Sequence, residues 1–589
     1  MQGGRFATCA CAILLAAASA DGQSPPPRTL DATLRNAPQR RGAFFELHGY
    51  LRLRSDLFSN YTFGGSADPA LKNLARLFTP FGERNPNAGL SQPEITRSND
   101  RTLASASMRL RFEPTLNIHD DIRVKAQLDV LDNLVLGSTP EGFPNPSGFA
   151  PLSAFTPGAV PPSDGVNSLQ DSIRVKRAWG EVGTPFGLFA FGRMPAHFGM
   201  GIYANRGDCL DCDYGDTFDR FLFVSKLAGH YAGLFIDFAS EGLTSDVAEL
   251  VQRSRAEPTR RGAFFDRYLG RPYDADQRDD VTQYGLIFMR NAAPSEVKEK
   301  LQNGESLTNY GLMVLFRNQG KTTENRSYAT AGNAFQGRFD QTDLSRQPLF
   351  ERRGATYWVF DPWVKYMNGR FVFEAEATFV VGTIDTAPSG EALDIFQYGG
   401  VVRASNGFFN GKLHLGIEAG IASGADGAGL NLRDAPGVSP VRDVSGTRRM
   451  LASPNNFKFD PDYQLDRILF RELVGAFTSA WYAKPTMQYN FSELLGLRIS
   501  MIYSNALNSR QWPGSSIPES APGRGDGGCG GCPLGLETNV DFIIRYKPND
   551  FLYAQFGYAG LIPFNGLRAS APLLSSYAQT LYTRLVVRY

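Results

Sequence analysis

The chain has no long hydrophobic run beyond its N-terminal region. None of the later segments holds the roughly 18 consecutive apolar residues that a membrane-spanning helix needs. An excess of one charge is also missing: 60 Lys and Arg residues stand against 59 Asp and Glu residues, which argues against a nucleic-acid-binding protein. Only 5 histidines and 6 cysteines occur in 589 residues, and no GxSxG, HExxH or phosphate-loop motif is present. We therefore expect no enzyme activity, no cofactor and no nucleic-acid partner.

The N-terminal region has the features of an export signal. Arg5 supplies a positive start, residues 6–18 form a short apolar run, and residues 18–20 (Ala-Ser-Ala) form a small-residue cleavage site. We predict a signal peptide over residues 1–20 and a Pro-rich periplasmic lead-in over residues 21–43. An exported chain without a helical anchor is either a soluble protein or an outer-membrane β-barrel.

What the chain does have is an alternation of apolar and polar residues with a period of two. Around residue 52, Leu51 and Leu53 alternate with Arg52 and Arg54. Side chains alternate across a β-strand, so each such strand has one apolar and one polar face. The 43 Phe, 23 Tyr and 61 Gly residues also favour strands, turns and aromatic girdles.

This pattern predicts an all-β protein: a transmembrane antiparallel up-and-down β-barrel of about 18 strands with long extracellular loops, over residues 44–589. Strands are predicted near residues 44–58, 104–113, 122–130, 172–183, 188–193, 219–226, 231–241, 281–290, 307–317, 354–366, 371–382, 396–404, 412–422, 475–490, 496–505, 536–547, 551–560 and 576–589.

The connections between these strands alternate between short turns and long loops. The short ones, such as residues 184–187 and 367–370, hold turn-forming residues, and the long ones are rich in Gly, Pro, Asn and Asp. A soluble β-sandwich would also have one polar and one apolar face, but regular alternation of loop length is typical of a barrel with periplasmic turns and extracellular loops. The turn at residues 295–301 is predicted to contain a small helix.

The last strand ends on the aromatic residue Tyr589, with apolar residues at most alternate positions before it. This ending resembles the C-terminal signal that the outer-membrane assembly machinery reads. We expect a monomer in the outer membrane of a Gram-negative bacterium. Its expected partners are membrane lipid, that machinery, and small-molecule or anionic solutes.

If the apolar positions face lipid, the alternate positions line the lumen. The early strands offer basic residues for this inner face: Arg52, Arg54, Arg109, Arg111, Arg123, Lys125, Arg174, Lys176 and Arg193. Later strands offer acidic ones: Asp237, Glu241, Glu374, Glu376 and Glu418. Two interpretations stay open. Opposite walls create a field that selects charged solutes, with a tilt toward anions, or the charges pair across neighbouring strands and only make the interior polar.

A barrel of about 18 strands is wider than side chains alone can fill. The long loops at residues 194–218 and 424–466 are therefore candidates for a constriction or a plug.

The mature chain keeps two CxxC pairs in predicted outer loops, Cys209 with Cys212 and Cys529 with Cys532. An exported protein favours disulfides, either within each pair or between the two loops across the barrel mouth; zinc binding is the alternative. Four carboxylates near the first pair are weak calcium candidates although their spacing does not match an EF-hand: Asp208, Asp211, Asp213 and Asp216.

Short motifs resemble those of porin-type outer-membrane barrels. Residues 177–187 (RAWGEVGTPFG), with residues 192–195 (GRMP) and 199–201 (GMG), resemble a porin hairpin of the form W-x-E…PFG…GR-x-P…G-x-G. Residues 457–463 (FKFDPDY) and 466–471 (DRILFR) resemble a late extracellular segment of an uncharacterised barrel family near the alginate-export porin group. In strand count and length the chain is similar to that group. The resemblance implies a barrel of about 18 strands and passive passage of solutes.

Three functional hypotheses follow. The first is a porin-like channel for passive diffusion of small or charged solutes through a charged lumen. The second is a surface structural or adhesive barrel that displays disulfide-braced loops. The third is an outer-membrane hydrolase that would use His48 or His414, both predicted to face the lumen, although polar lumen residues are the simpler interpretation.

Overall fold

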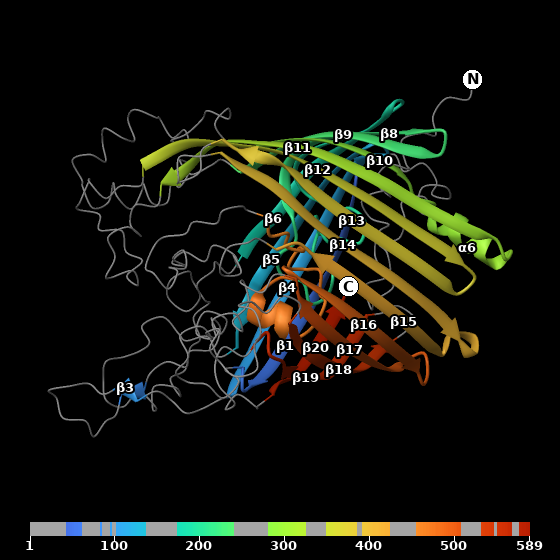
Figure 1. Ribbon diagram of the computed structural model, residues 1–589. Helices are drawn as coiled ribbons and strands as arrows, with labels where there is room; N and C mark the ends of the chain where they lie inside the picture. Colours follow the sequence, from blue (N-terminus) through green and yellow to red (C-terminus); the bar gives the residue numbers. More distant parts are fainter. Residues whose placement is uncertain are drawn as a thin grey trace, which may run out of the picture.

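The structure, a computed structural model, describes residues 43–61, 83–84, 95–96, 102–136, 173–240, 281–324, 349–385, 392–424, 455–507, 532–546, 551–567 and 577–589. Its main feature is a single closed sheet of 18 antiparallel strands (Figure 1). These strands are β1 (Phe44–Ser59), β4 (Thr102–His119), β5 (Ile122–Val135), β6 (Ile173–Thr184), β7 (Gly187–Pro195), β8 (Thr217–Leu227), β9 (His230–Ser240), β10 (Val281–Arg290), β11 (Ser306–Glu324), β12 (Leu349–Asn368), β13 (Phe371–Ile384), β14 (Leu393–Phe408), β15 (Leu413–Ala422), β16 (Ala480–Asn490), β17 (Leu495–Ala506), β18 (Pro533–Tyr546), β19 (Leu552–Pro563) and β20 (Ala578–Arg588). A separate two-stranded sheet pairs β2 (Glu83–Arg84) with β3 (Ile95–Thr96).

Each barrel strand pairs with its neighbours in sequence, and β1 pairs with both β4 and β20, which closes the ring. The predicted up-and-down barrel is therefore confirmed, with all of its predicted strands present. The short connections gather at one end of the barrel, on the right in Figure 1. The helix predicted in one of these turns is α6 (Pro294–Gln302), in which Val297 and Leu301 pack against a small cluster with Leu307 and Met367.

The outer face of the barrel is apolar. Exposed positions alternate with buried ones along the strands, and large hydrophobic side chains occupy the exposed ones, among them Leu51, Val175, Leu234, Ile417 and Leu581. An even-stranded, closed barrel with such an exterior is the architecture of outer-membrane proteins. No helix in the described residues is long and apolar enough to span a membrane.

The start of β16 differs from the prediction. A strand beginning at residue 475 was expected, but β16 begins at Ala480. Residues Leu469–Val474 form a short π-helix (η4), and Gly475 and Ser479 take left-handed backbone conformations, with φ of 90° and 49°. A strand cannot continue through such residues, so the chain before Ala480 turns away from the sheet.

Two non-strand segments fold into the barrel and bury an apolar core there. We call residues 196–216, between β7 and β8, and residues 455–479, before β16, the luminal segments. Five of their phenylalanine side chains are almost fully buried, namely Phe198, Phe457, Phe459, Phe470 and Phe477. These rings pack against inward-facing wall residues, including Val359 and Tyr482. The η4 helix of the second segment is the orange coil in Figure 1.

Gly49 leaves room for Tyr589 to form hydrogen bonds with both β1 and β4 where the barrel closes. Gly49 N–H donates to the Tyr589 carbonyl at 3.1 Å, and the Tyr589 hydroxyl donates to the Arg111 carbonyl at 2.8 Å. A Cβ at position 49 would collide with Tyr589 and with the Arg111 carbonyl.

We expect Gly49→Val to destabilise the folded barrel by about 1–3 kcal/mol through overpacking. The shift from folded to unfolded mobility on heated gels checks this, with Gly400→Val as the control, because the backbone there is not left-handed and the atoms nearest to an added Cβ lie at 3.5 Å or more.

Candidate functional site

The inner face of the barrel carries the charged residues. Eight of the nine predicted basic residues lie on this face: Arg52, Arg54, Arg109, Arg111, Arg123, Lys125, Arg174 and Lys176. The acidic residues Asp237, Glu374, Glu376 and Glu418 are also buried on it. Glu241 lies outside the described residues.

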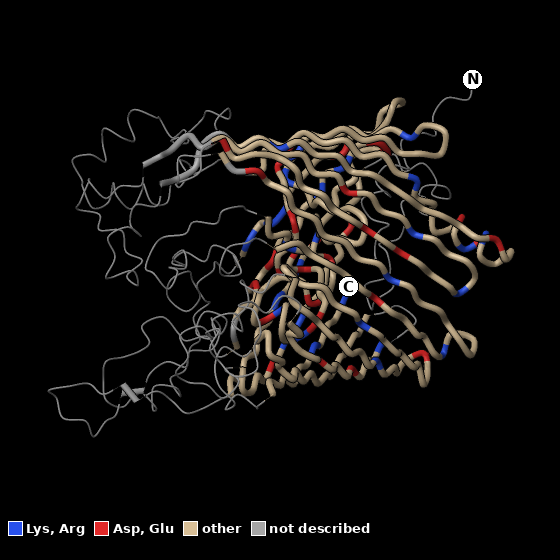
Figure 2. Tube along the Cα trace, in the orientation of Figure 1, with Lys and Arg blue, Asp and Glu red and all other residues tan. Residues whose placement is uncertain are grey.

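Neighbouring strands pair these charges with each other. Arg111 binds Asp129 through two hydrogen bonds of 2.6 and 2.8 Å, and Lys125 lies 3.0 Å from Glu181. On the later strands, Glu374 contacts Arg403 at 2.8 Å. Figure 2 accordingly shows blue and red segments interleaved along the strands. The walls are therefore of mixed sign, as in the second of the two interpretations left open by the sequence.

The predicted luminal position of Arg193 is wrong. Arg193 shares the outward face of β7 with the exposed residues Phe189 and Phe191, and its side chain is 57% exposed. It makes a two-pronged ion pair with Asp219 of β8, at 2.6 and 2.8 Å. The pair lies near the end of β7 that is away from the short turn, where an outward charge can lie beyond the apolar band.

Several inward arginines were not recognised from the sequence, among them Arg177, Arg220, Arg403 and Arg584. Arg220 of β8 binds Asp237 through hydrogen bonds of 2.5 and 2.8 Å. Arg177 of β6 faces the lumen because the β5–β6 register shifts between Gln127 and Leu128. Such a bulge puts an extra residue in one strand and changes which side chains face inward. Arg177 donates to the Arg206 carbonyl of the first luminal segment at 2.6 Å.

The first luminal segment crosses the whole lumen. The backbone N–H groups of Met200, Gly201 and Ile202 donate to the Glu376 carboxylate on β13. Farther along the same segment, the Cys212 carbonyl accepts a hydrogen bond of 2.9 Å from Arg109 on β4. Eight strands separate β4 from β13 in either direction around the ring, so these anchors lie on opposite walls.

The second luminal segment is fixed to the first and to the wall. The Asp462 carboxylate accepts the N–H groups of Asp213, Tyr214 and Gly215, at 2.6 to 3.0 Å. The Glu537 carboxylate on β18 accepts the N–H groups of residues 467–469, at 2.7 to 3.2 Å. Carboxylates that accept several backbone N–H groups hold a chain segment firmly, so the two segments form one connected obstruction.

Asp211 lies at the centre of an arginine cluster between the segments and the wall. Four arginines reach its carboxylate: Arg467 at 2.7 Å, Arg471 at 2.8 Å, Arg584 at 2.7 Å and Arg54 at 3.5 Å. Burial alone would raise the pKa of Asp211, but these four guanidinium groups outweigh it and hold the pKa well below its usual range. The arginines therefore favour the ionised form of Asp211.

Asp213 binds a second group of arginines on β1 and β4. Its carboxylate lies 2.9 Å from Arg52, 2.6 Å from Arg54 and 3.0 Å from Arg109. Burial opposes ionisation here too, and the three arginines lower the pKa of Asp213 below its usual range. The two aspartates together bind three of the early-strand arginines that the sequence placed on a basic wall, Arg52, Arg54 and Arg109.

A disulfide joins Cys209 to Cys212 next to these aspartates. The expectation of a disulfide is confirmed for this pair. Since each of the two sulfurs is used by the other, a bridge from this pair to the second CxxC loop does not form. Cys532 is also disulfide-bonded, and Cys529 lies outside the described residues.

The four calcium candidates do not form a cation site. Asp211 and Asp213 bind arginines, and Asp208 pairs with Arg206 at 2.5 Å. Asp216 accepts the Asn205 N–H at 3.1 Å. Among the described residues, no group of three or more His, Cys, Asp or Glu side chains is placed to hold a metal ion.

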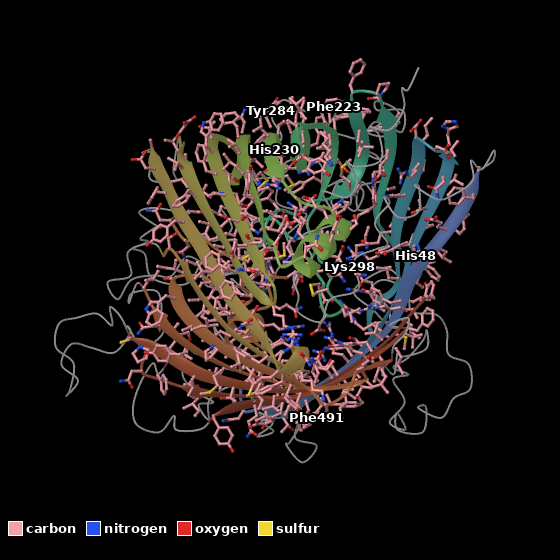
Figure 3. All side chains as sticks on the ribbon, turned by 90° about the vertical axis from the view of Figure 1, so that its right-hand side faces the viewer. His48, Phe223, His230, Tyr284, Lys298 and Phe491 are labelled. Atoms are coloured by element: carbon pink, nitrogen blue, oxygen red, sulfur yellow. A yellow bond between two sulfur atoms is a disulfide. The ribbon has the colours of Figure 1, made fainter. Side chains whose placement is uncertain are left out.

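The two histidines considered for a hydrolase lie on well-separated strands. His48 is opposite Glu113 on β1–β4, and His414 is opposite Gln488 on β15–β16. Both are exposed and close to the short-turn end of the barrel, which faces the viewer in Figure 3. Five strands, β16 to β20, separate β15 from β1 around one side of the ring.

Comparison with known proteins gives structural likeness only. No protein-family model matches the chain, and no curated protein sequence matches it. The structure of Pseudomonas aeruginosa OpdK solved with vanillate is similar, with a TM-score of 0.40 and 10% identity, covering 92% of this chain and 98% of that chain. The outer-membrane channel DcaP of Acinetobacter baumannii is similar with a TM-score of 0.35 and 9% identity, covering 94% of this chain and 99% of that one. OccAB4 of Acinetobacter baumannii is similar with a TM-score of 0.38 and 9% identity, covering 92% of this chain and 98% of that one.

At these scores the likeness carries no argument of its own, and the assignment to an outer-membrane barrel rests on the closed sheet and its apolar exterior. The resemblance to the alginate-export group is not confirmed by these comparisons and stays a prediction.

Proposed function

We propose that the protein is an outer-membrane channel for small charged solutes whose lumen is narrowed by the two luminal segments. The observation that supports this proposal most directly is the interior of the 18-stranded barrel, which carries buried charged residues from many strands. A barrel of about this size encloses more space than its wall side chains can fill. The segments 196–216 and 455–479 make the opening narrower and more selective than the bare barrel.

Anions are the favoured solutes. Six arginines surround Asp211 and Asp213, namely Arg52, Arg54, Arg109, Arg467, Arg471 and Arg584. Asp56, Asp132 and Glu472 also pair with arginines of this group, which leaves only a small net positive charge. Fixed positive charge that lines a low-dielectric pore raises the local anion concentration. Passage would be passive, driven by the solute gradient.

The sign of the selectivity can be tested at two partly exposed luminal residues. Arg174 and Lys176 face Asp132 on the inner wall, at 3.7 and 3.3 Å, with side chains 45% and 26% exposed. We expect Arg174→Gln with Lys176→Gln to shift the reversal potential in a salt gradient toward cation selectivity. Planar-bilayer recordings of the refolded mature protein measure this shift.

Arg193→Gln is the matched control, because it removes an arginine from the outer face of the same barrel. It should leave the reversal potential unchanged. An equal reversal potential in wild type and in the luminal double variant would contradict the proposed selectivity.

A surface structural barrel is the second candidate function. It is favoured by the apolar core inside the lumen, where Phe198, Phe457 and Phe459 are each at most 2% exposed. Under this alternative the luminal segments would block the lumen permanently. A folded, membrane-inserted protein without conductance in any condition would support it.

A further inference from the structure

The turn at residues 209–212 connects several parts of the barrel. Arg52 of β1 donates to the Leu210 carbonyl at 2.9 Å, and Arg109 of β4 donates to the Cys212 carbonyl at 2.9 Å. The Asp211 side chain between them is bound by Arg584 of β20 and by Arg467 of the second segment. One four-residue turn therefore ties three adjacent wall strands to both luminal segments.

These contacts depend on the path of the backbone through the turn. The Leu210 and Cys212 carbonyls must point at two arginines while the Asp211 side chain points at others. The disulfide between Cys209 and Cys212 closes the ring that fixes this path, and the Cys212 N–H donates to the Cys209 carbonyl within it at 3.1 Å. An open four-residue chain has many other conformations, and ordering it again would cost conformational entropy.

We propose that the Cys209–Cys212 disulfide is a redox latch, and that its reduction releases the turn from the arginines and opens the lumen. The inference rests on the proposed channel function and adds its regulation. Cys209 is half-buried while Cys212 is only 2% exposed, so Cys209 is the more accessible residue of the pair to an attacking thiol. The reductant is a dithiol, small or protein-borne.

The chemical step is thiol–disulfide exchange. One thiolate of the dithiol attacks Cys209 Sγ and breaks the Cys209–Cys212 bond, which leaves Cys212 as a thiolate that takes up a proton. The second thiol of the reductant then attacks the mixed disulfide and releases Cys209 as a thiol. Two electrons and two protons pass to the cysteine pair, and the reductant leaves as its own disulfide.

Release of the turn changes the pore in two ways. The segments lose the contacts that hold them against β1, β4 and β20, and the arginines that bound Asp211 and the turn carbonyls become available to solutes. Loss of a short-range cross-link shifts the docking equilibrium of such a turn by roughly tenfold. We therefore expect a higher mean conductance after reduction, together with greater anion selectivity.

The test is a planar-bilayer recording of the full mature chain before and after addition of dithiothreitol to the side of the long loops. The second CxxC pair provides a matched control within the same chain. Cys529→Ser with Cys532→Ser leaves the latch intact and should respond to dithiothreitol as the wild type does. Cys209→Ser with Cys212→Ser should conduct from the start at the reduced level and should not respond.

Alkylation followed by mass spectrometry reports which cysteines are reduced in the same samples. If the wild type conducts and reduction of Cys209 and Cys212 leaves its conductance unchanged, the latch is refuted and the channel stands. If the oxidised protein, the reduced protein and the Cys209→Ser, Cys212→Ser variant are all folded and silent, both the latch and the channel are refuted. A response that disappears only in the Cys529→Ser, Cys532→Ser variant would assign the redox effect to the other loop and overturn the proposal.

Discussion

Replacing Asp211 by asparagine is expected to detach the luminal segments and to raise the conductance of the barrel. The carboxylate of Asp211 is the shared partner of Arg54, Arg467, Arg471 and Arg584. An amide keeps the shape of the side chain but removes the charge, which leaves four buried guanidinium groups without their common counter-ion. Removing one partner of a buried ion pair costs about 3–5 kcal/mol.

The barrel itself should survive this substitution. Its strands are held by a closed ladder of backbone hydrogen bonds around the ring, and Asp211 takes no part in that ladder. The substitution therefore destabilises the docked state of residues 196–216 and 455–479 rather than the barrel. With these segments released and the arginines no longer sharing the Asp211 carboxylate, both the conductance and the preference for anions should increase.

Hydrogen–deuterium exchange and single-channel recording together check this expectation. The amides of Asp213, Tyr214 and Gly215 are bound by Asp462 in the docked state. Their exchange should become roughly 100-fold faster or more in the D211N variant, while the barrel strands keep their protection.

Asp208→Asn serves as the control, because the Asp208 side chain is 42% exposed and pairs with Arg206 and Arg177 at the margin of the cluster. It should change neither exchange nor conductance appreciably. Slow exchange of residues 213–215 in the D211N variant would show that Asp211 does not hold the segments in place.

The sequence predicts the barrel wall well because the signal there is local. Each strand alternates between lipid and lumen, so residues two apart report the same environment, as Leu51 and Leu53 do against Arg52 and Arg54. The same logic fails where the period is interrupted. The bulge near Gln127 turns Arg177 inward, and the local amino-acid composition does not predict this bulge.

Charge alone was also misleading at Arg193, which was assigned to the lumen although Phe189 and Phe191 share its face. Strict use of parity along β7 would have placed it outside. The luminal segments show a different limit. The loops around residues 194–218 and 424–466 were identified as candidates to enter the pore, but their anchors come from distant strands.

Glu376 and Glu537 illustrate this limit. Each is a single carboxylate on a strand, at β13 and β18, and each accepts N–H groups from a segment that is 68 or more residues away in sequence. Nothing within one strand distinguishes such a carboxylate from one that pairs with a neighbouring lysine or arginine, as Glu374 does. The partners become known only when the fold brings the segments together.

A second large effect is expected from pH, through two carboxyl groups that meet where the luminal segments touch. Asp216 of the first segment and Asp460 of the second share a side-chain hydrogen bond, which requires a proton on one of them. Burial, followed by the nearby Asp216 carboxyl, raises the pKa of Asp460 to about 9. Asp462 on the same segment adds further negative charge, whereas Arg177 of β6 lowers the pKa of Asp216.

The direction of the effect follows from proton linkage. In a detached segment, Asp460 would have the ordinary aspartate pKa of about 4. The docked form therefore keeps a proton that the detached form loses as the pH rises above this value. Docking is strongest below about pH 4, weakens as the pH rises, and reaches its weakest level once the pH passes the docked pKa of about 9.

We therefore expect the channel to conduct more at pH 9 than at pH 5, with the change spread over that interval. Asp460→Asn keeps a hydrogen-bonding side chain without its proton equilibrium, so its conductance should vary much less with pH. Asp219→Asn, which alters a carboxylate on the outer face, should retain the wild-type dependence. If the Asp460→Asn and wild-type curves coincide between pH 5 and pH 9, the contact between Asp216 and Asp460 does not control docking.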